Sequence, residues 1–107
     1  MTTKRVKTHW VRIYLSAPLH AIEDECRHEC LRDGLCVTVD PTRFIYTGGE
    51  ETGAVVGLIN YPRFPTTKKE LWKRAHDLAL KLLLVTCQNS VMIMSEDQTE
   101  WLSRRED

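Results

Sequence analysis

The stretch LCVTVDPTRFIYTGGEETGAVVGLINY, residues 35–61, contains two runs rich in β-branched residues, 35–47 and 54–61, joined by a glycine-rich segment. In the first run Leu35, Val37 and Val39 alternate with Cys36 and Thr38, which is typical of a half-buried strand, and extended character resumes at residues 43–47. The glycines of residues 47–53 favour a connection between antiparallel strands. Pro41 cannot donate a ladder hydrogen bond, so we expect a bend there. The stretch therefore predicts a β-hairpin.

Residues 9–16, upstream of the hairpin, show the same alternation and predict a further strand. Ser16 offers an oxygen for a helix N-cap, and Pro18 suits the first turn of a helix. Gly34 is suited to the left-handed position that follows a helix. We therefore predict a helix that begins at Ser16 and ends at Gly34.

Downstream of the hairpin, Thr67–Glu70 has the form of a capping box and predicts the start of a second helix, which reaches about Cys87. Residues 91–94 form a short apolar run that predicts a core strand. After a turn, residues 99–103 are expected to add an edge strand.

The predicted order is strand, helix, strand, strand, helix, strand. It favours a single domain over residues 1–107, with an α+β fold of the ferredoxin-like βαββαβ type. In this sandwich both helices lie on one face of an antiparallel sheet. The alternative is another α+β sandwich with a different strand order.

Composition narrows the class of protein. Fifteen basic and fifteen acidic residues give a formal net charge of zero, which argues against a surface built wholly for nucleic acid. A hydrophobic fraction of 42% is enough for a modest core. The first residues lack the apolar stretch of a secretory signal, and no run is long enough for a membrane span, so we expect a cytoplasmic location. A near-neutral chain also favours association, and we expect a homo-oligomer.

Four cysteines in a reducing compartment are expected to be thiols. Cys26 and Cys30 share the helical spacing of Leu19 and Ile22, which indicates packing under the sheet. The spacing of the cysteines and histidines matches no zinc or iron–sulfur motif. We therefore expect neither a metal nor another cofactor.

The histidines offer the one route to acid–base chemistry that the sequence suggests. His20 and His28 lie in the first predicted helix, outside any recognisable catalytic motif. A small phosphoesterase that uses His20 or His28 is therefore an alternative rather than the leading interpretation.

Five residues are predicted to bind a ligand: Arg43, Tyr46, Asn60, Arg63 and Trp101. Asn60 and Arg63 belong to a loop stiffened by two prolines, which lowers the entropy lost on binding. Arginines can grip phosphate or carboxylate with two hydrogen bonds, and aromatic rings can stack on a planar group. If Trp10, Tyr46 and Trp101 share the sheet face that lacks helices, they form an apolar patch suited to stacking or oligomerisation.

The segments 35–39, 47–51 and 56–65 together resemble small accessory proteins of bacteriophages and prophages. The resemblance brings no catalytic residues, but it implies a factor that acts on the host, such as an anti-defence protein. The resulting hypothesis is a non-enzymatic protein that binds a host protein or sequesters a small anionic or nucleotide ligand in the host cytoplasm. Two alternatives stay open, the phosphoesterase and a nucleic-acid-binding module.

Overall fold

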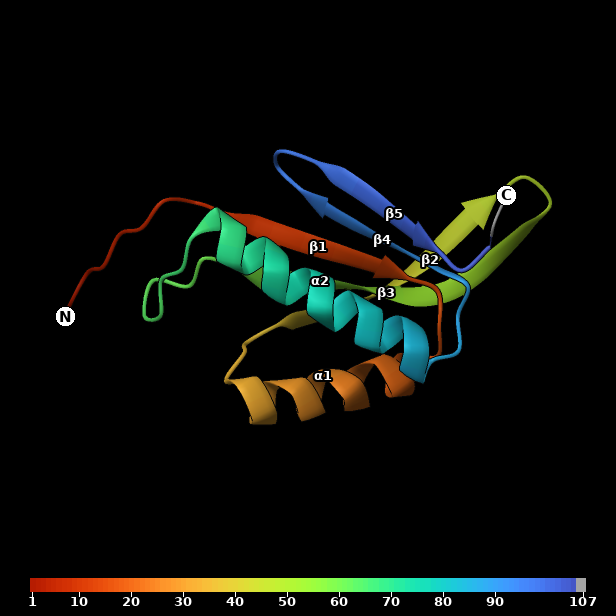
Figure 1. Cartoon of the computed structure of the whole chain (residues 1–107), viewed down its shortest axis with the longest axis horizontal. Helices are drawn as coiled ribbons and strands as arrows, with labels where there is room; N and C mark the ends of the chain where they lie inside the picture. The colour runs from red at the N-terminus through yellow and green to blue at the C-terminus, as the bar shows by residue number, and fades with distance from the viewer. Residues whose placement is uncertain (106–107) are drawn as a thin grey trace.

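The computed structural model of the chain describes residues 1–105 and consists of one antiparallel sheet and two helices (Figure 1). The elements in chain order are β1 (Trp10–Leu15), α1 (Leu19–Asp33), β2 (Thr38–Tyr46), β3 (Gly49–Ile59), α2 (Lys68–Val85), β4 (Ser90–Ser95) and β5 (Thr99–Ser103). The strands are ordered β2-β3-β1-β4-β5, and each neighbouring pair is antiparallel. The predicted α+β class with both helices on one sheet face is confirmed. Strands β2-β3-β1-β4 are compatible with a ferredoxin-like sheet, and β5 adds a fifth strand beside β4.

The core lies between the helices and one face of the sheet. Strand β1 is central, and alternate residues Val11, Ile13 and Leu15 are buried on the helix side. Helix α2 meets them with a stripe of buried residues at intervals of three and four: Leu71, Ala75, Leu78, Ala79, Leu82 and Leu83. Because strands alternate with a period of two, burying one face leaves the other set of side chains on the opposite face of the sheet.

The predicted N-cap is correct for α2 and wrong for α1. Helix α2 begins as expected, since the Thr67 hydroxyl accepts a hydrogen bond from the backbone N–H of Glu70 at 3.1 Å. The prediction that Ser16 caps the first helix is wrong. Helix α1 begins at Leu19, Pro18 is its N-cap residue, and the Ser16 hydroxyl instead donates to the Glu51 carboxylate at 2.6 Å. Ser16 therefore belongs to the surroundings of Glu51.

The end of α1 agrees with the prediction and provides a test. Gly34 has φ +69°, and its N–H donates to the carbonyl of Cys30 at 3.0 Å. Because a β-branched residue tolerates this left-handed conformation badly, Gly34→Val should lower the free energy of unfolding by about 1 kcal/mol or more. Urea denaturation measures the change, with Gly34→Asn as a milder control. A Val variant as stable as the Asn variant would contradict the assigned cap.

The hairpin departs from the prediction in two ways. Strand β2 runs through Pro41 without interruption, because it is the outer strand of the sheet and one of its edges has no neighbour. The connection is also shorter than expected: only Thr47 and Gly48 form the turn, and β3 begins at Gly49. Strand β1 pairs with β3 only over residues 54–59, so residues 42–53 extend past the end of β1. This segment, called the hairpin arm below, projects beside the C-terminal strands (Figure 1).

The cysteines are free thiols. Cys26 is buried in the core, and burial raises its pKa to about 12, so the thiol is uncharged at neutral pH. Cys30 is half-buried on the same helix. Packing of Cys26 under the sheet is thus confirmed. Within residues 1–105, no cluster of three or more histidine, cysteine or acidic side chains has the arrangement of a metal site.

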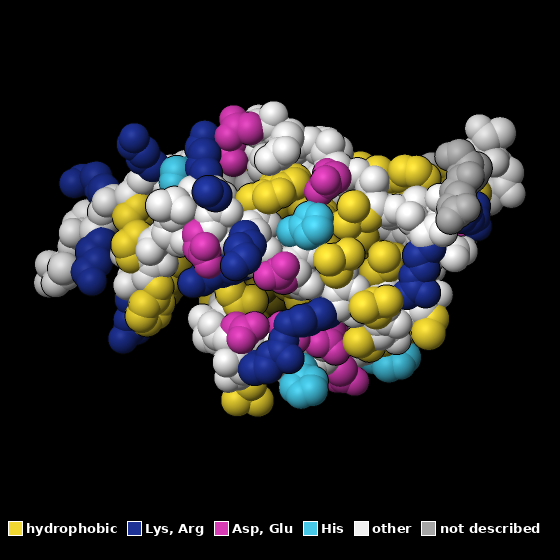
Figure 2. All heavy atoms as spheres, in the orientation of Figure 1, with side chains coloured by type: hydrophobic (Ala, Val, Ile, Leu, Met, Phe, Trp, Pro, Cys, Tyr) yellow, Lys and Arg dark blue, Asp and Glu magenta, His cyan; other side chains and the backbone are white. Residues whose placement is uncertain are grey.

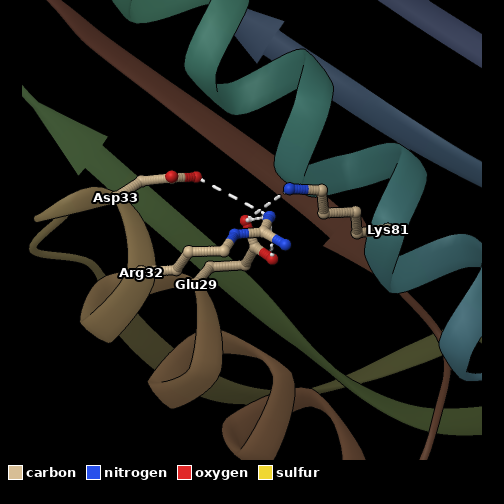
Figure 3. Close-up of polar contacts among 4 residues, drawn as sticks. All are labelled: Glu29, Arg32, Asp33 and Lys81. Atoms are coloured by element: carbon tan, nitrogen blue, oxygen red, sulfur yellow. Dashed lines mark hydrogen bonds and ion pairs between the residues drawn. The ribbon is translucent and has the colours of Figure 1, made fainter.

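A buried carboxylate joins the two helices (Figure 3). The Glu29 side chain of α1 is 5% exposed and accepts two hydrogen bonds from the Arg32 guanidinium, at 2.7 and 2.8 Å. Lys81 of α2 donates to the same carboxylate at 2.8 Å. Two cations therefore compensate for its burial, as a buried charge requires.

Charge and apolar surface are segregated along α2. Figure 2 shows many of the basic side chains at the end that carries the N-terminal segment and the start of α2, and apolar side chains over the other end of this helix. Leu80, Leu84 and Val85 are exposed there. Neither helix of the described chain is long and apolar enough to cross a bilayer.

Candidate functional site

The face of the sheet that turns away from the helices carries the candidate site, and it is called the open face below. Strand register places Trp10, Arg12 and Tyr14 of β1 on it, because they alternate with the buried residues of the same strand. Trp101 of β5 pairs with Met92 of β4 and lies on the same face. Tyr46, in the hairpin arm, lines a hollow together with Tyr14 and Trp101. Trp10, Tyr46 and Trp101 therefore share the helix-free face, which meets the condition set for an apolar patch.

One hollow on this face, the aromatic hollow, has a volume of about 310 Å³. It forms where the end of β1, the hairpin arm and the β4–β5 pair meet. Four aromatic rings, two aliphatic side chains, two serines and one glutamate make up its lining: Tyr14, Ser16, Phe44, Tyr46, Glu51, Ser90, Val91, Met92 and Trp101. Segments far apart in the sequence thus converge on one concave, ring-lined surface, which is the usual form of a small-molecule site.

Glu51 is held in this hollow by two hydroxyl groups. The Ser16 hydroxyl donates to Oε2 at 2.6 Å, and the Tyr46 phenol donates to Oε1 at 3.1 Å. These hydrogen bonds, that of Ser16 first, lower the pKa of the Glu51 carboxyl below its ordinary value of 4.5. The bond to Glu51 also raises the pKa of the Tyr46 phenol, which stays protonated. The hollow therefore presents an oriented, ionised carboxylate.

A carboxylate among aromatic rings is suited to an organic cation. Opposite charge attracts the cation directly, and the faces of tyrosine and tryptophan rings attract it through their quadrupoles. The same rings offer a flat surface for a planar base. The aromatic hollow can thus accommodate a ligand that carries both a positive centre and a heteroaromatic ring.

A second hollow, the glycine hollow, lies around the start of β1 and has a volume of about 520 Å³. Gly57 lies in its floor, between its cross-strand neighbours Arg12 of β1 and Thr38 of β2. The Arg12 guanidinium is stacked over the Trp10 ring, 4.4 Å from its centroid. Asp40 of β2 also lines the hollow. Opposite charges therefore stand on the two strands that flank β3.

The structure brings together two of the five predicted ligand-binding residues, since Tyr46 and Trp101 both line the aromatic hollow. Arg43 lies outside it and faces Glu50 at 3.5 Å. Asn60 is buried, where its amide donates to the Lys7 carbonyl at 2.7 Å and accepts from the Thr66 N–H at 2.8 Å. Arg63 lies in the following loop, 5.6 Å from the centre of the Phe64 ring.

Sequence reasoning missed Glu51 and Ser16. The glycine-rich sequence predicts that Glu51 lies in the hairpin turn, whereas the short turn places it within β3. The serine was assigned to a helix cap. Alternation along β3 could have assigned Glu51 to the face of Val55 and Gly57 if the turn had been located at residues 47–48. The contact between Glu51 and Ser16 joins residues 35 positions apart, so it forms only when the sheet is assembled.

The histidines are dispersed. His20 and His28 are exposed on α1, which packs on the other side of the sheet. His76 of α2 lies 3.3 Å from Glu100 of β5. His9 is buried and lines the glycine hollow. The two histidines proposed for a phosphoesterase therefore lie away from the aromatic hollow.

Comparison with known proteins identifies two solved structures with the same fold. A phage SAM lyase in its apo state superposes with a TM-score of 0.78 at 14% identity, over 100% of this chain and 99% of that one. A phage SAM lyase in complex with S-methyl-5′-thioadenosine gives a TM-score of 0.75 at 15% identity, over 100% and 98% of the two chains. No family model and no curated protein matches the sequence. At this identity the likeness shows the fold.

These structures correct the leading functional hypothesis. Both are phage proteins, in agreement with the resemblance noted from sequence. Both are also structures of an enzyme, which contradicts the prediction of a non-enzymatic binding protein, and neither the phosphoesterase nor the nucleic-acid module is better matched. The absence of a known catalytic motif was a weak argument, because a site assembled from scattered strands leaves no local motif. The chain thus shares, over its whole length, the fold of a phage SAM lyase.

Proposed function

We propose that the protein is an enzyme that binds S-adenosylmethionine (SAM) on the open face and cleaves it to release methylthioadenosine. The main support for this proposal is the position of Glu51. Its ionised carboxylate accepts hydrogen bonds from Ser16 and Tyr46 in a hollow lined with aromatic rings. SAM contains a permanently charged sulfonium and a planar adenine, the two groups for which this hollow is suited. The shared fold of a SAM lyase supports the same ligand.

In the proposed complex, the sulfonium lies beside Glu51 and the adenine stacks on Tyr46 or Trp101. Both rings were among the residues predicted from sequence. The Tyr46 phenol stays protonated and donates a hydrogen bond to Glu51, so the carboxylate keeps its negative charge.

The reaction breaks the bond between sulfur and the γ-carbon of the methionine chain. Both electrons of this bond stay on sulfur, which becomes the neutral thioether of methylthioadenosine. The four-carbon fragment completes its valence internally, by closure of its own carboxylate onto the γ-carbon or by loss of a β-proton, so no water is consumed. Glu51 orients the sulfonium in the first case and is placed to accept the proton in the second.

Purified protein mixed with SAM should form methylthioadenosine, which liquid chromatography with mass spectrometry would detect. S-adenosylhomocysteine, a neutral thioether without the leaving-group charge, should remain intact under the same conditions. A Glu51→Gln preparation controls for contaminating activity. Wild-type protein that formed no more methylthioadenosine than a mock preparation from cells lacking the protein would show the proposed function to be wrong.

The role of the protein in the host cell and its oligomeric state form part of the same proposal. A phage accessory enzyme that removes SAM in the host cytoplasm would deprive host methyltransferases of their methyl donor, which is one route to anti-defence activity. The open face and the loop after β3 expose apolar side chains, among them Ile59 at 56% and Phe64 at 70%. Exposed apolar surface of this kind favours association, so we propose that the protein is a homo-oligomer.

A further inference from the structure

We infer that the nucleoside part of the substrate lies across the sheet from Glu51 toward β5, with its ribose hydrogen-bonded to Ser90 and its adenine stacked on Trp101. This inference rests on the proposed function and deepens it in two respects. It selects Trp101 rather than Tyr46 as the stacking ring. It also assigns Ser90, which has no role in the proposed reaction, as the residue that recognises the ribose.

Strand register places Ser90 beside the serine that holds Glu51. Tyr14 of β1 pairs with Met92 of β4. Continued by two residues, this antiparallel register puts Ser16, just after β1, opposite Ser90, the first residue of β4. Residues opposite each other on antiparallel strands have Cα atoms about 5 Å apart. Both serines line the aromatic hollow, and the Ser16 hydroxyl donates to Glu51 at 2.6 Å. Ser90 therefore lies one strand beyond Ser16 on the way from the carboxylate to the C-terminal strands.

Trp101 lies one strand beyond Ser90, because β5 pairs with β4 and places Trp101 opposite Met92. It lines the aromatic hollow and is 61% exposed, so a flat ligand can cover the indole ring. Neighbouring strands are about 4.8 Å apart, so β1, β4 and β5 together span about 10 Å. Across this distance they present, in order, the serine bonded to Glu51, a second serine hydroxyl and an aromatic ring.

Tyr46 is less suited to stacking on a base, because its ring and its hydroxyl already contact the protein. The phenol donates to Glu51 at 3.1 Å. Tyr46 pairs with Gly49 across the hairpin turn, and a β-carbon on Gly49 would lie 3.1 Å from Cε2 of the ring. The ring therefore lies close against the backbone of β3. Tyr46 also belongs to β2, on the other side of β3 from β4 and β5. It orients the carboxylate, and Trp101 is available for the adenine.

The Ser90 hydroxyl is available to a ligand. Within residues 1–105 it has no hydrogen-bond partner. The hydroxyl of Ser103, its cross-strand neighbour, accepts a hydrogen bond from the N–H of Arg105 at 3.0 Å. A serine hydroxyl both donates and accepts, as does each hydroxyl of a ribose. Ser90 is half-buried in a ring-lined hollow and therefore offers a specific partner for the sugar.

The order of groups in the hollow matches the order of groups in SAM. In SAM the ribose joins the sulfonium, at its 5′ carbon, to the adenine, at its 1′ carbon. In the hollow Ser90 lies between Glu51 and Trp101 in the same way. Two strand spacings separate β1 from β5, so one nucleoside can extend from the carboxylate to the indole along the open face.

Titration calorimetry with methylthioadenosine and its 2′-deoxy and 3′-deoxy analogues tests the contact with Ser90. Wild-type protein should bind at least one of the deoxy analogues about fivefold more weakly than methylthioadenosine, because one hydrogen bond is lost. Ser90→Ala should bind methylthioadenosine about fivefold more weakly than wild type and should no longer distinguish it from that analogue. Ser103→Ala is the matched control, since Ser103 lies on the same face outside the hollow, and it should keep the wild-type discrimination.

Substitution of the two rings tests the position of the base. Trp101→Leu should weaken binding of methylthioadenosine at least tenfold, because stacking on the indole is lost, and Trp101→Phe should recover part of this affinity. Tyr46→Leu should change the affinity less than threefold, since methylthioadenosine is a neutral thioether and does not need the oriented carboxylate. A large loss for Tyr46→Leu beside normal binding by Trp101→Leu would reverse the orientation and refute the inference.

Results with wild-type protein separate this inference from the proposed function. Cleavage of SAM by a protein that binds all three nucleosides equally, or whose Ser90→Ala variant keeps the discrimination, would refute the Ser90 contact alone. Wild-type protein that neither bound methylthioadenosine nor cleaved SAM would refute the proposed function as well.

Discussion

Replacement of Glu51 by Gln should lower kcat/KM for SAM at least a hundredfold. The substitution keeps the size of the side chain and removes the negative charge that faces the sulfonium in the aromatic hollow. It also replaces one acceptor oxygen by an amide N–H₂ that cannot accept from Ser16 or Tyr46. Loss of a single preoriented electrostatic group in an active site typically costs a hundredfold to a thousandfold in rate.

Glu50→Gln is the matched control, because Glu50 is the neighbouring carboxylate and faces Arg43 rather than the hollow. Its activity should stay within twofold of wild type. Initial rates of methylthioadenosine formation compare the two variants directly. Equal activities of Glu50→Gln and Glu51→Gln would remove Glu51 from the site.

The same residue predicts a pH dependence. Hydrogen bonds from Ser16 and Tyr46 lower the pKa of Glu51 in the folded protein, so the ionised form persists as pH falls to its ordinary pKa of 4.5. Stability linked to this group is therefore present above pH 4.5 and is lost as pH falls through the lowered pKa. The contribution of Glu51 to activity should follow the same titration.

Gly53→Ala should lower the free energy of unfolding by about 3 kcal/mol, the upper end of the usual cost of overpacking. Gly53 is buried where the hairpin arm crosses the end of β1. An added β-carbon would overlap the main-chain oxygen of Leu15 and lie 2.8 Å from the Ser16 Cα. Because both atoms belong to the backbone, no side-chain rotation relieves the overlap. Urea denaturation monitored by tryptophan fluorescence measures the loss.

Gly57→Ala serves as the comparison. Its β-carbon would meet the hydroxyl oxygen of Thr38 at 2.6 Å, and this side chain can rotate away. The expected cost is below about 1 kcal/mol. Equal destabilisation by the two substitutions would contradict the close approach of backbones at Gly53. This approach also brings the hairpin arm to Ser16, so a folded Gly53→Ala protein should lose activity as well.

The elements whose signals are local were predicted well. Thr67 and Glu70 lie three residues apart and cap α2 in the structure, and Gly34 takes the left-handed conformation expected after α1. Alternation along β1 identified its buried face. These features depend on neighbouring residues, so a short window of sequence contains the information.

Errors arose where a local signal competed with tertiary contacts. Ser16 has the chemistry of an N-cap, but its hydroxyl contacts a carboxylate 35 residues away. Pro41 suggests a bend, yet the outer edge of a sheet tolerates a missing N–H. The glycines at 49 and 53 suggested a loop, whereas pairing with β2 keeps them extended.

The sequence by itself determined the α+β class and the strand and helix order, because periodicity and capping are encoded between near neighbours. Only the tertiary structure decided which residues surround Glu51. Ser16 directly follows β1, Tyr46 and Glu51 belong to the hairpin arm, and Trp101 belongs to β5. Their meeting depends on strand order, on register and on the length of the arm. Those quantities follow from long-range pairing, which no local pattern of residues specifies.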